Sequence, residues 1–412
     1  MPKKSGATRA ARGLWLLGPA LVAGVAYLDP GNVASNMTAG AQFGYLLVWV
    51  VVAGNVMAWL IQYLSAKLGV VTGRSLPELL GERLRHPWAR RAYWLQAELV
   101  AMATDLAEVI GGAVALNLLF GIPLLAGGLI TGAVSMVMLA LHSRRGPRHF
   151  EFVIIGLMVV ITIGFLAGVF IAPPDPLAVV GGLVPRFEGS GSVLLAASIL
   201  GATIMPHAIY AHSSLTRDRF GSGDRADAET RTLLRATRWD VSIAMIVAGS
   251  VNLGILLLAA ANLAGVEGTD SLEGAHAALE TGLGPVVATL FAVGLLASGL
   301  ASTSVGAYAG SEIMHGLLHV RIPLLARRLV TLIPALVILW AGVDPTLALV
   351  LSQVALSFGI PFALIPLVAL TAQQRTLGRW TNRVWTTIAG VVASVLLIAL
   401  NGVLLWMVLT GA

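Results

Sequence analysis

Long apolar stretches alternate with short polar segments from one end of the 412-residue chain to the other. An apolar helix of around 20 residues is long enough to cross the roughly 30 Å hydrocarbon core of a bilayer. The pattern therefore predicts an all-α membrane protein with a single polytopic domain over residues 1–412. We expect eleven spans, near residues 13–40, 43–70, 92–120, 122–142, 150–172, 191–215, 239–265, 281–318, 322–342, 345–371 and 383–410.

Two of these spans carry a proline near their middle. The first contains YLDPGNV, with Asp29 directly before Pro30, and the sixth contains TIMPHAI, with Met205 directly before Pro206. Proline removes a backbone donor and clashes with the preceding turn of a helix. We therefore expect both spans to be discontinuous, with each break close to the middle of the membrane.

The two breaks lie at corresponding positions five spans apart. Transporters with a central site between discontinuous helices are built from such inverted repeats. The spacing predicts a first five-helix repeat over residues 13–172 and a second over residues 191–371. Residues 383–410 then form an additional, eleventh helix.

The composition supports a membrane protein. Hydrophobic residues make up 57% of the chain and charged residues only 11%, whereas a soluble protein carries about 25% charged residues. Cysteine is absent, which excludes disulfides, thiolate ligands and cysteine nucleophiles. The sequence pI of about 10.0 reflects basic loops between spans, so we expect no nucleic-acid partner.

The distribution of lysine and arginine predicts the orientation. If the N-terminus is cytoplasmic, 25 of the 26 basic residues fall on the cytoplasmic side, and Arg186 is the exception. Positive charge favours the cytoplasmic side, so the C-terminus of an eleven-span chain should be extracytoplasmic. No small-residue cleavage pattern follows MPKKSGATRAARG, and we expect this segment to be retained. Arginine outnumbers lysine 23 to 3, which favours a GC-rich bacterium and its inner membrane.

The residues at the two breaks have the chemistry of a cation site. Asp29 offers a charged oxygen, Asn32 a neutral oxygen and Met205 a soft sulfur. Mg²⁺ and Ca²⁺ prefer shells made only of oxygen, whereas transition metals gain from softer ligands. An intramembrane carboxylate is usually functional. A methionine in an apolar helix usually packs, and Asn32 has a second interpretation as a helix cap.

Ionisable residues also cluster in the third span. Glu98, Asp105 and Glu108 share one face of a helix, because seven residues bring the chain back to within about 20° of the same direction. Acids three residues apart raise one another's proton affinity, which suits a proton relay. The alternative is a structural charge pair with an arginine on a neighbouring helix.

Four further residues have two interpretations each. Arg327 and Arg328 begin the ninth span, where they either join such a charge network or snorkel to the interface. His207 and His212 follow the second break and are either proton carriers or ordinary buried polar residues. A zinc pair is disfavoured, because five residues separate the two histidines by about 140° around a helix.

At this point the sequence resembles the Nramp family. The segments that carry the resemblance are DPGN in span one, MPH in span six, MAWLIQYLSAKLGVVTGRSLPE and ELVAMATDLAEVIGG, and the similarity extends over roughly residues 13–410. The resemblance implies a proton-coupled transporter of divalent transition metals, of which the bacterial members import manganese. It also implies a LeuT-like fold of two inverted five-helix repeats, with an eleventh helix in many bacterial members.

The resemblance assigns roles to individual residues. Asp29, Asn32 and Met205 would be metal ligands. The backbone carbonyls of Ala26 and Ala202 would join them in different conformations. Gln353, in LSQVALSFGIPFALIPL, matches a position implicated when the site closes, although an interhelical hydrogen bond explains it equally well.

The resemblance also implies a proton and charge network beside the metal site. Its members would be the three acids of span three with Arg327 and Arg328. It supports a role for His207 in proton coupling or gating, and less strongly one for His212. Asp29 would release a proton when the metal binds.

The expected function is therefore proton-coupled import of Mn²⁺ by alternating access, with Fe²⁺, Co²⁺ and Cd²⁺ as further substrates. The expected partners are the metal, protons and membrane lipid, with no cofactor and no required oligomer. Three alternatives are a sodium-coupled amino-acid transporter of the same architecture, an intramembrane enzyme and a passive channel. The sequence contains neither H-E-x-x-H nor G-x-S-x-G, which disfavours the enzyme.

Overall fold

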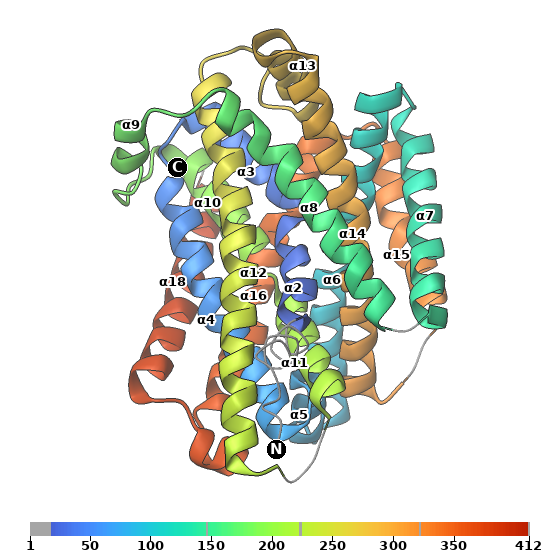
Figure 1. Ribbon diagram of the computed structural model, residues 1–412, viewed down its shortest axis with the longest axis vertical. Helices are drawn as coiled ribbons and strands as arrows, with labels where there is room; N and C mark the ends of the chain where they lie inside the picture. Colours follow the sequence, from blue (N-terminus) through green and yellow to red (C-terminus); the bar gives the residue numbers. More distant parts are fainter. Residues whose placement is uncertain (1–17, 146, 222–224, 321–322, 411–412) are drawn as a thin grey trace, which may run out of the picture.

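The computed structural model describes residues 18–145, 147–221, 225–320 and 323–410, and within these ranges every regular element is a helix. Figure 1 shows the long helices packed against one another in one bundle. The elements are α2 (Pro19–Val25), η1 (Ala26–Leu28), α3 (Pro30–Phe43), α4 (Val48–Thr72), α5 (Leu76–Arg83), α6 (Pro87–Phe120), α7 (Leu124–Arg145), α8 (Pro147–Ile171), α9 (Pro176–Gly181), α10 (Gly189–Thr203), α11 (Pro206–Phe220), α12 (Asp227–Asn262), α13 (Leu272–Leu283), α14 (Pro285–Leu318), α15 (Leu324–Trp340), α16 (Pro345–Thr371), α17 (Gln374–Leu377), η2 (Gly378–Trp380) and α18 (Val384–Thr410).

The predicted spans coincide with these helices. Eight helical segments are by themselves long and apolar enough to cross a membrane, and one of them is α10 with α11, taken together as Gly189–Phe220. Pro19–Leu28 and Leu124–Met138 are shorter apolar helices, and α15 has 17 residues. Each predicted span thus corresponds to one helix or, at spans one and six, to a broken pair. The prediction of an all-α membrane fold is confirmed.

Some predicted boundaries are wrong. The seventh span was expected to begin near residue 239, but α12 begins at Asp227. The eighth span was expected over residues 281–318, but α14 begins only at Pro285, and the residues before Gly284 belong to α13. Gly284 has φ of 91°, a backbone conformation that glycine adopts without steric cost. Pro285 then starts the next helix, where its fixed φ is favourable. The break is therefore a local consequence of the Gly-Pro pair.

Both predicted interruptions are present, and they form in the same way. Asp29 (φ −70°, ψ 164°) and Met205 (φ −62°, ψ 120°) are both extended. A residue before proline is pushed out of the helical region by the proline ring. Pro30 and Pro206 then begin α3 and α11. The first break is capped by the Asp29 side chain, which accepts from the backbone N–H of Asn32, whereas the second has no side-chain cap.

The two ends of the bundle differ in charge. At the lower end in Figure 1, which we call the basic end, α5 lies beside the end of α11 and the start of α12. The basic end carries Arg74, Arg83, Arg85, Arg217, Arg225 and Arg375. The opposite end carries α9 and α13. Lys3, Lys4, Arg9, Arg12 and Arg321, which entered the orientation argument, lie outside the described residues.

Candidate functional site

The two breaks meet in the interior of the bundle through the side chain of Asn32. Its amide Nδ2 donates to Asp29 Oδ1 at 3.1 Å and to the carbonyl oxygen of Ala202 at 2.8 Å. Ala202 lies in the last turn of α10, where backbone carbonyls lack partners within the helix. The Asn32 side chain, on α3, thus connects the carboxylate of the first break to a backbone carbonyl at the second.

A third element, α16, completes this cluster. Gln353 donates from Nε2 to Asp29 Oδ2 at 3.3 Å, so the interhelical hydrogen bond expected as one of its two roles is present. Two glycines allow α16 to come this close. A Cβ atom on Gly31 would overlap the Gln353 side chain, and one on Gly201 would overlap the Gln353 carbonyl.

Two buried amide oxygens of this cluster have no hydrogen-bond donor. They are Oδ1 of Asn32 and Oε1 of Gln353. A buried polar atom without a partner costs about 1–3 kcal/mol. In both residues the NH₂ group faces Asp29, and the oxygen is the atom left without a partner. The cluster therefore holds more acceptor capacity than the protein itself satisfies.

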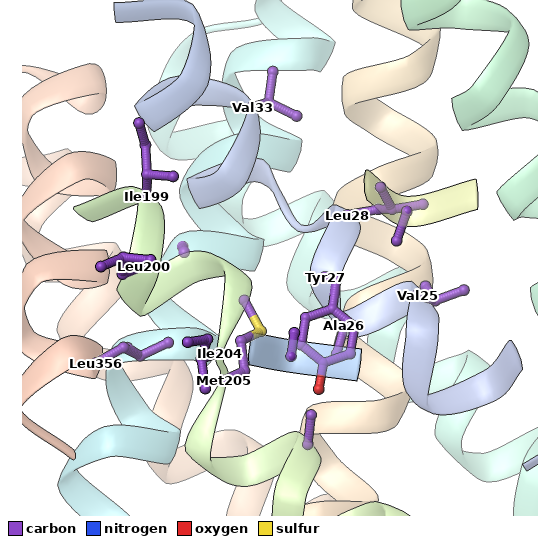
Figure 2. Packing of buried hydrophobic residues seen from close by; sticks show 14 of the residues in the cluster. Val25, Ala26, Tyr27, Leu28, Val33, Ile199, Leu200, Ile204, Met205 and Leu356 are labelled. Carbon is purple, nitrogen blue, oxygen red and sulfur yellow. The ribbon is translucent and has the colours of Figure 1, made fainter. Parts of the chain in front are cut away.

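Met205 and Ala26 contribute the remaining predicted atoms. Both residues are fully buried and belong to the same core cluster. In Figure 2, the Met205 side chain points from the break between α10 and α11 toward the segment that carries Ala26 and Tyr27. The sulfur thus lies on the side of the second break that faces the first.

The structure captures a closed site. Asp29, Asn32, Met205 and Gln353 all have 0% exposed surface. Among the described residues there is no group of three His, Cys, Asp or Glu side chains that could hold a metal ion. A cation at the breaks would depend on the mixed set of carboxylate, amide, carbonyl and thioether.

A second buried polar cluster joins α6 to α15. Arg327 Nη2 lies 2.9 Å from Glu98 Oε1, and Arg328 Nη1 lies 2.8 Å from Asp105 Oδ1 and 3.4 Å from Glu108 Oε2. All five predicted members of the charge network therefore converge. Arg327 is 6% exposed, so the alternative of snorkelling at the interface is wrong for this conformation.

The two predicted histidines lie in different surroundings. His207 Nδ1 lies 3.2 Å from Thr104 Oγ1, one residue before Asp105 on α6. His212 Nδ1 lies instead 2.6 Å from Gln62 Oε1 on α4, and the Gln62 amide donates to the Tyr27 hydroxyl. His207 therefore borders the charge network, whereas His212 leads by hydrogen bonds to the first break.

The sequence analysis missed the residues that hold the first broken helix. Asp240 of α12 accepts from the backbone N–H groups of Gly18 at 3.2 Å and Ala20 at 2.9 Å, which are orphan donors at the start of α2. Asn252 Nδ2 donates to the Tyr27 carbonyl at 2.9 Å. Both positions are isolated polar residues in an apolar span, and this isolation was the feature of the sequence that could have identified them.

The far end of α11 is fixed by ion pairs that were also not predicted. Arg217 lies 2.7 Å from Glu78 of α5 and 2.8 Å from Glu312 of α14. Burial alone would raise the pKa of Glu78, but hydrogen bonds from Ser75 and Arg217 outweigh it and hold the pKa below its usual value. Ser75 and Glu78 form a capping box, and the motif S-x-x-E in SLPE was its signal.

Comparisons with known proteins agree with this architecture. The family model described as Nramp, natural resistance-associated macrophage protein-like, matches residues 20–407. The chain is 60% identical to the divalent metal cation transporter MntH of Mycobacterium tuberculosis, over 96% of this chain and 92% of that protein. It is 48% identical to MntH of Bacillus subtilis, over 96% and 93%.

Solved structures give the same relationship. The manganese transporter of Eremococcus coleocola matches with a TM-score of 0.85 and 31% identity, over 97% of this chain and 87% of that one. MhsT in complex with L-phenylalanine matches with a TM-score of 0.59 and 14% identity, over 93% and 98%, a likeness of fold alone. The fold is thus the predicted LeuT-like one, and the chain belongs to the Nramp family.

Proposed function

We propose that the protein imports divalent transition metal ions across the membrane by alternating access, that this import is coupled to protons, and that it needs no cofactor. Mn²⁺ is the main substrate of this proposal, with Fe²⁺, Co²⁺ and Cd²⁺ as further ones. Its main support is the cluster at the breaks, where a buried carboxylate lies among amide oxygens that have no donor. The MntH relatives, which are named divalent metal cation transporters, support the same class of substrate.

A bound cation would resolve the hydrogen-bonding deficit of the cluster. In the closed state, the NH₂ groups of Asn32 and Gln353 donate to Asp29. Rotating either amide by half a turn would direct its unpartnered oxygen to the space beside the carboxylate. A divalent ion there would replace the amide donors as the positive partner of Asp29. Amide and carboxylate oxygens are suitable ligands for such an ion.

We assign Met205 to selectivity. A thioether offers little to Mg²⁺ or Ca²⁺, which bind oxygen, but it is a favourable ligand for softer transition metals. The carbonyls of Ala26 and Ala202 would complete the shell in different conformations. In the closed state the Ala202 carbonyl accepts from Asn32, and movement of that amide would free this lone pair for the ion.

The charge network suits proton transfer. It places three carboxyl groups against two guanidinium groups, so full ionisation would leave one negative charge in excess inside the bilayer. Holding that charge is costly unless a proton neutralises it. A divalent ion arriving at Asp29 favours loss of a proton there. We infer that this proton, or one from His207, passes by Thr104 to Asp105 and Glu108.

Alternating access would require contacts at the basic end to open. Asp240 holds the start of α2, and Arg217 holds the end of α11. These are the halves of the two broken helices that lie toward the basic end, on the same side of the cluster. We infer that the basic end faces the cytoplasm, because basic residues concentrate there. Release would then involve movement of α2 and α11 away from α12, α5 and α14.

The alternatives fit the cluster less well. An amino-acid transporter of this fold needs exposed backbone amides for a substrate carboxylate, whereas Asp29 would repel that group. A passive channel would not respond to a proton gradient. Uptake of radiolabelled Mn²⁺ into proteoliposomes, with and without an inward proton gradient, therefore separates them. The proposal predicts uptake that the gradient increases, a passive channel predicts uptake that does not respond to the gradient, and an amino-acid transporter predicts no Mn²⁺ uptake.

The uptake experiment has a matched pair of variants. Asp344 precedes Pro345 and caps α16, just as Asp29 precedes Pro30 and caps α3. Asp29→Ala should reduce Mn²⁺ uptake by roughly 100-fold or more, as expected for removing a buried charged ligand. Asp344→Ala removes an equivalent cap, and uptake should persist. Equal loss in both variants, or uptake indifferent to the proton gradient, would refute the proposal.

A further inference from the structure

An open pocket of about 700 Å³ lies at the basic end, away from the cluster at the breaks. It is formed between the α4–α5 connection, α5 and the start of α17. The polar residues that line it are Thr72, Arg74, Glu82, Arg83, Arg85, Arg375 and Thr376. Four of these seven residues are arginines and one is an acid, so positive charge predominates on this concave surface.

Most of this positive charge has no carboxylate partner. Arg74 forms an ion pair with Glu82. Among the described residues, no ion pair joins Arg83, Arg85 or Arg375 to an acidic side chain. Arg83 instead donates to Thr376 Oγ1 at 2.9 Å, across the pocket from α5 to α17. The pocket therefore carries a net positive charge that the protein does not neutralise.

The arginines are close enough to affect one another. Partial burial, and after it the nearby charge of Arg375, lower the pKa of Arg83 below its usual value. Like charges across one pocket repel, and a bound anion would remove this repulsion. Guanidinium groups bind phosphate oxygens in a paired geometry that suits them to phosphate recognition.

The pocket lies at the level of the membrane interface. Trp88, three residues after Arg85, is 69% exposed, and Trp385 at the start of α18 is 80% exposed. Exposed tryptophans mark the headgroup level of a membrane protein. Basic pockets at this level between membrane helices are suited to anionic headgroups.

We propose that this pocket is a binding site for a phosphate-bearing anion, and that the headgroup of an anionic phospholipid is its occupant. Arg83, Arg85 and Arg375 bind the phosphate. Because Arg83 comes from α5 and Arg375 from α17, the bound headgroup fastens α5 to the connection between α16 and α18. Free phosphate shares this chemistry, and the experiment below separates the two sources.

The test uses the full-length protein in detergent micelles. Native mass spectrometry measures the retention of dioctanoyl phosphatidylglycerol and, for comparison, dioctanoyl phosphatidylcholine. We expect the phosphatidylglycerol to bind more tightly, and each of Arg83→Gln and Arg375→Gln to weaken it by roughly tenfold, the value of one charge-assisted hydrogen bond. Arg91→Gln is the control, because Arg91 is exposed at the same end and lies over the Trp88 ring.

Two further arms make the test decisive. Glu82→Gln should tighten phosphatidylglycerol binding, since it removes a negative charge and releases Arg74, and misfolding cannot produce a gain. A rise in unfolding temperature in sodium phosphate over sodium chloride at equal ionic strength, lost in Arg83→Gln, would support the site with free phosphate as a competing source. Equal retention of both lipids without a phosphate effect would overturn the proposal, as would equal losses in Arg91→Gln and Arg83→Gln.

Discussion

Two buried polar clusters lie side by side in this protein, and they satisfy their charges differently. At the breaks, Asp29 faces only neutral amide donors, and two amide oxygens have no partner. Between α6 and α15, every carboxylate has a guanidinium within ion-pairing distance. The first cluster lacks a positive charge, whereas the second already contains two.

This difference supports our proposal that the first cluster is a site for a transient cation and the second a permanent network. A cluster that is short of positive charge gains when a cation arrives and returns to amide donors when it leaves. A cluster with permanent arginines would repel the same cation, and its third carboxyl group suits the proton exchange that we propose. The two clusters are connected through α6, because Gly111 of α6 lies against the Pro30 ring. A structural change in one cluster therefore occurs close to the other.

The largest expected effect concerns stability. Arg328→Met removes a fully buried cation and leaves Asp105 and Glu108 without their closest partner. Breaking one side of a buried ion pair typically costs about 3–5 kcal/mol. Asn32→Ala at the breaks should lower the free energy of unfolding by only about 1 kcal/mol. Unfolding of the purified protein in mixed detergent measures both, and equal losses would remove the distinction between the clusters.

The next effect concerns the close approach of α16 to the first break. Gly31→Ala places a methyl group where the Gln353 side chain lies. Overpacking of this kind costs about 1–3 kcal/mol, and it should also displace the Gln353 amide and reduce Mn²⁺ uptake. Gly402→Ala on α18 is the control, because its Cβ would meet no atom within 4 Å. Wild-type uptake in Gly31→Ala would argue against a role for Gln353.

A smaller effect separates sulfur from oxygen ligands. Met205→Ala should retain Mn²⁺ uptake while relative uptake of Ca²⁺ or Mg²⁺ rises, by roughly tenfold if the thioether contributes about 1.4 kcal/mol to discrimination. Met245→Ala removes another buried methionine, from α12, and should leave selectivity unchanged. Competition of each ion against radiolabelled Mn²⁺ measures the ratio. Unchanged selectivity in Met205→Ala would count against the sulfur ligand.

The smallest effect is at the basic end. The pKa of Glu78 is held below its usual value, so its contacts stabilise the folded state above the usual pKa, and this contribution disappears as pH falls through the lowered one. Glu78→Gln should cost about 0.5–1 kcal/mol at neutral pH and nothing in strong acid. Glu267→Gln, at an exposed acid of the opposite end, is the control. A loss independent of pH would contradict the ion-pair explanation.

Much of the fold followed from local rules in the sequence. The spans follow from hydrophobic length, and both breaks follow from a proline after an extended residue. The sequence also placed Glu98, Asp105 and Glu108 on one helical face. Only the family resemblance pointed to Arg327 and Arg328 as their partners. Local rules could not pair them, because contacts such as Arg327 with Glu98 join residues far apart in the chain and depend on how α6 and α15 pack.

The missed residues have the same explanation. In the sequence, Asp240 is a single acidic residue at the start of an apolar span. Only the packing of α12 against α2 brings it to the Gly18 and Ala20 amides. The orientation of the Asn32 amide is likewise decided by two partners from different helices. The kinds of side chain at the breaks were therefore accessible from the sequence, whereas their hydrogen-bond partners were not.

The central claim is that one divalent ion binds where the two breaks meet. The most direct test is anomalous diffraction at the manganese edge from crystals of the full-length protein grown with Mn²⁺. We predict a peak within bonding distance of both the Asp29 carboxylate and the Met205 sulfur. A peak among Glu98, Asp105 and Glu108, or any principal peak that touches neither Asp29 nor Met205, would contradict the claim.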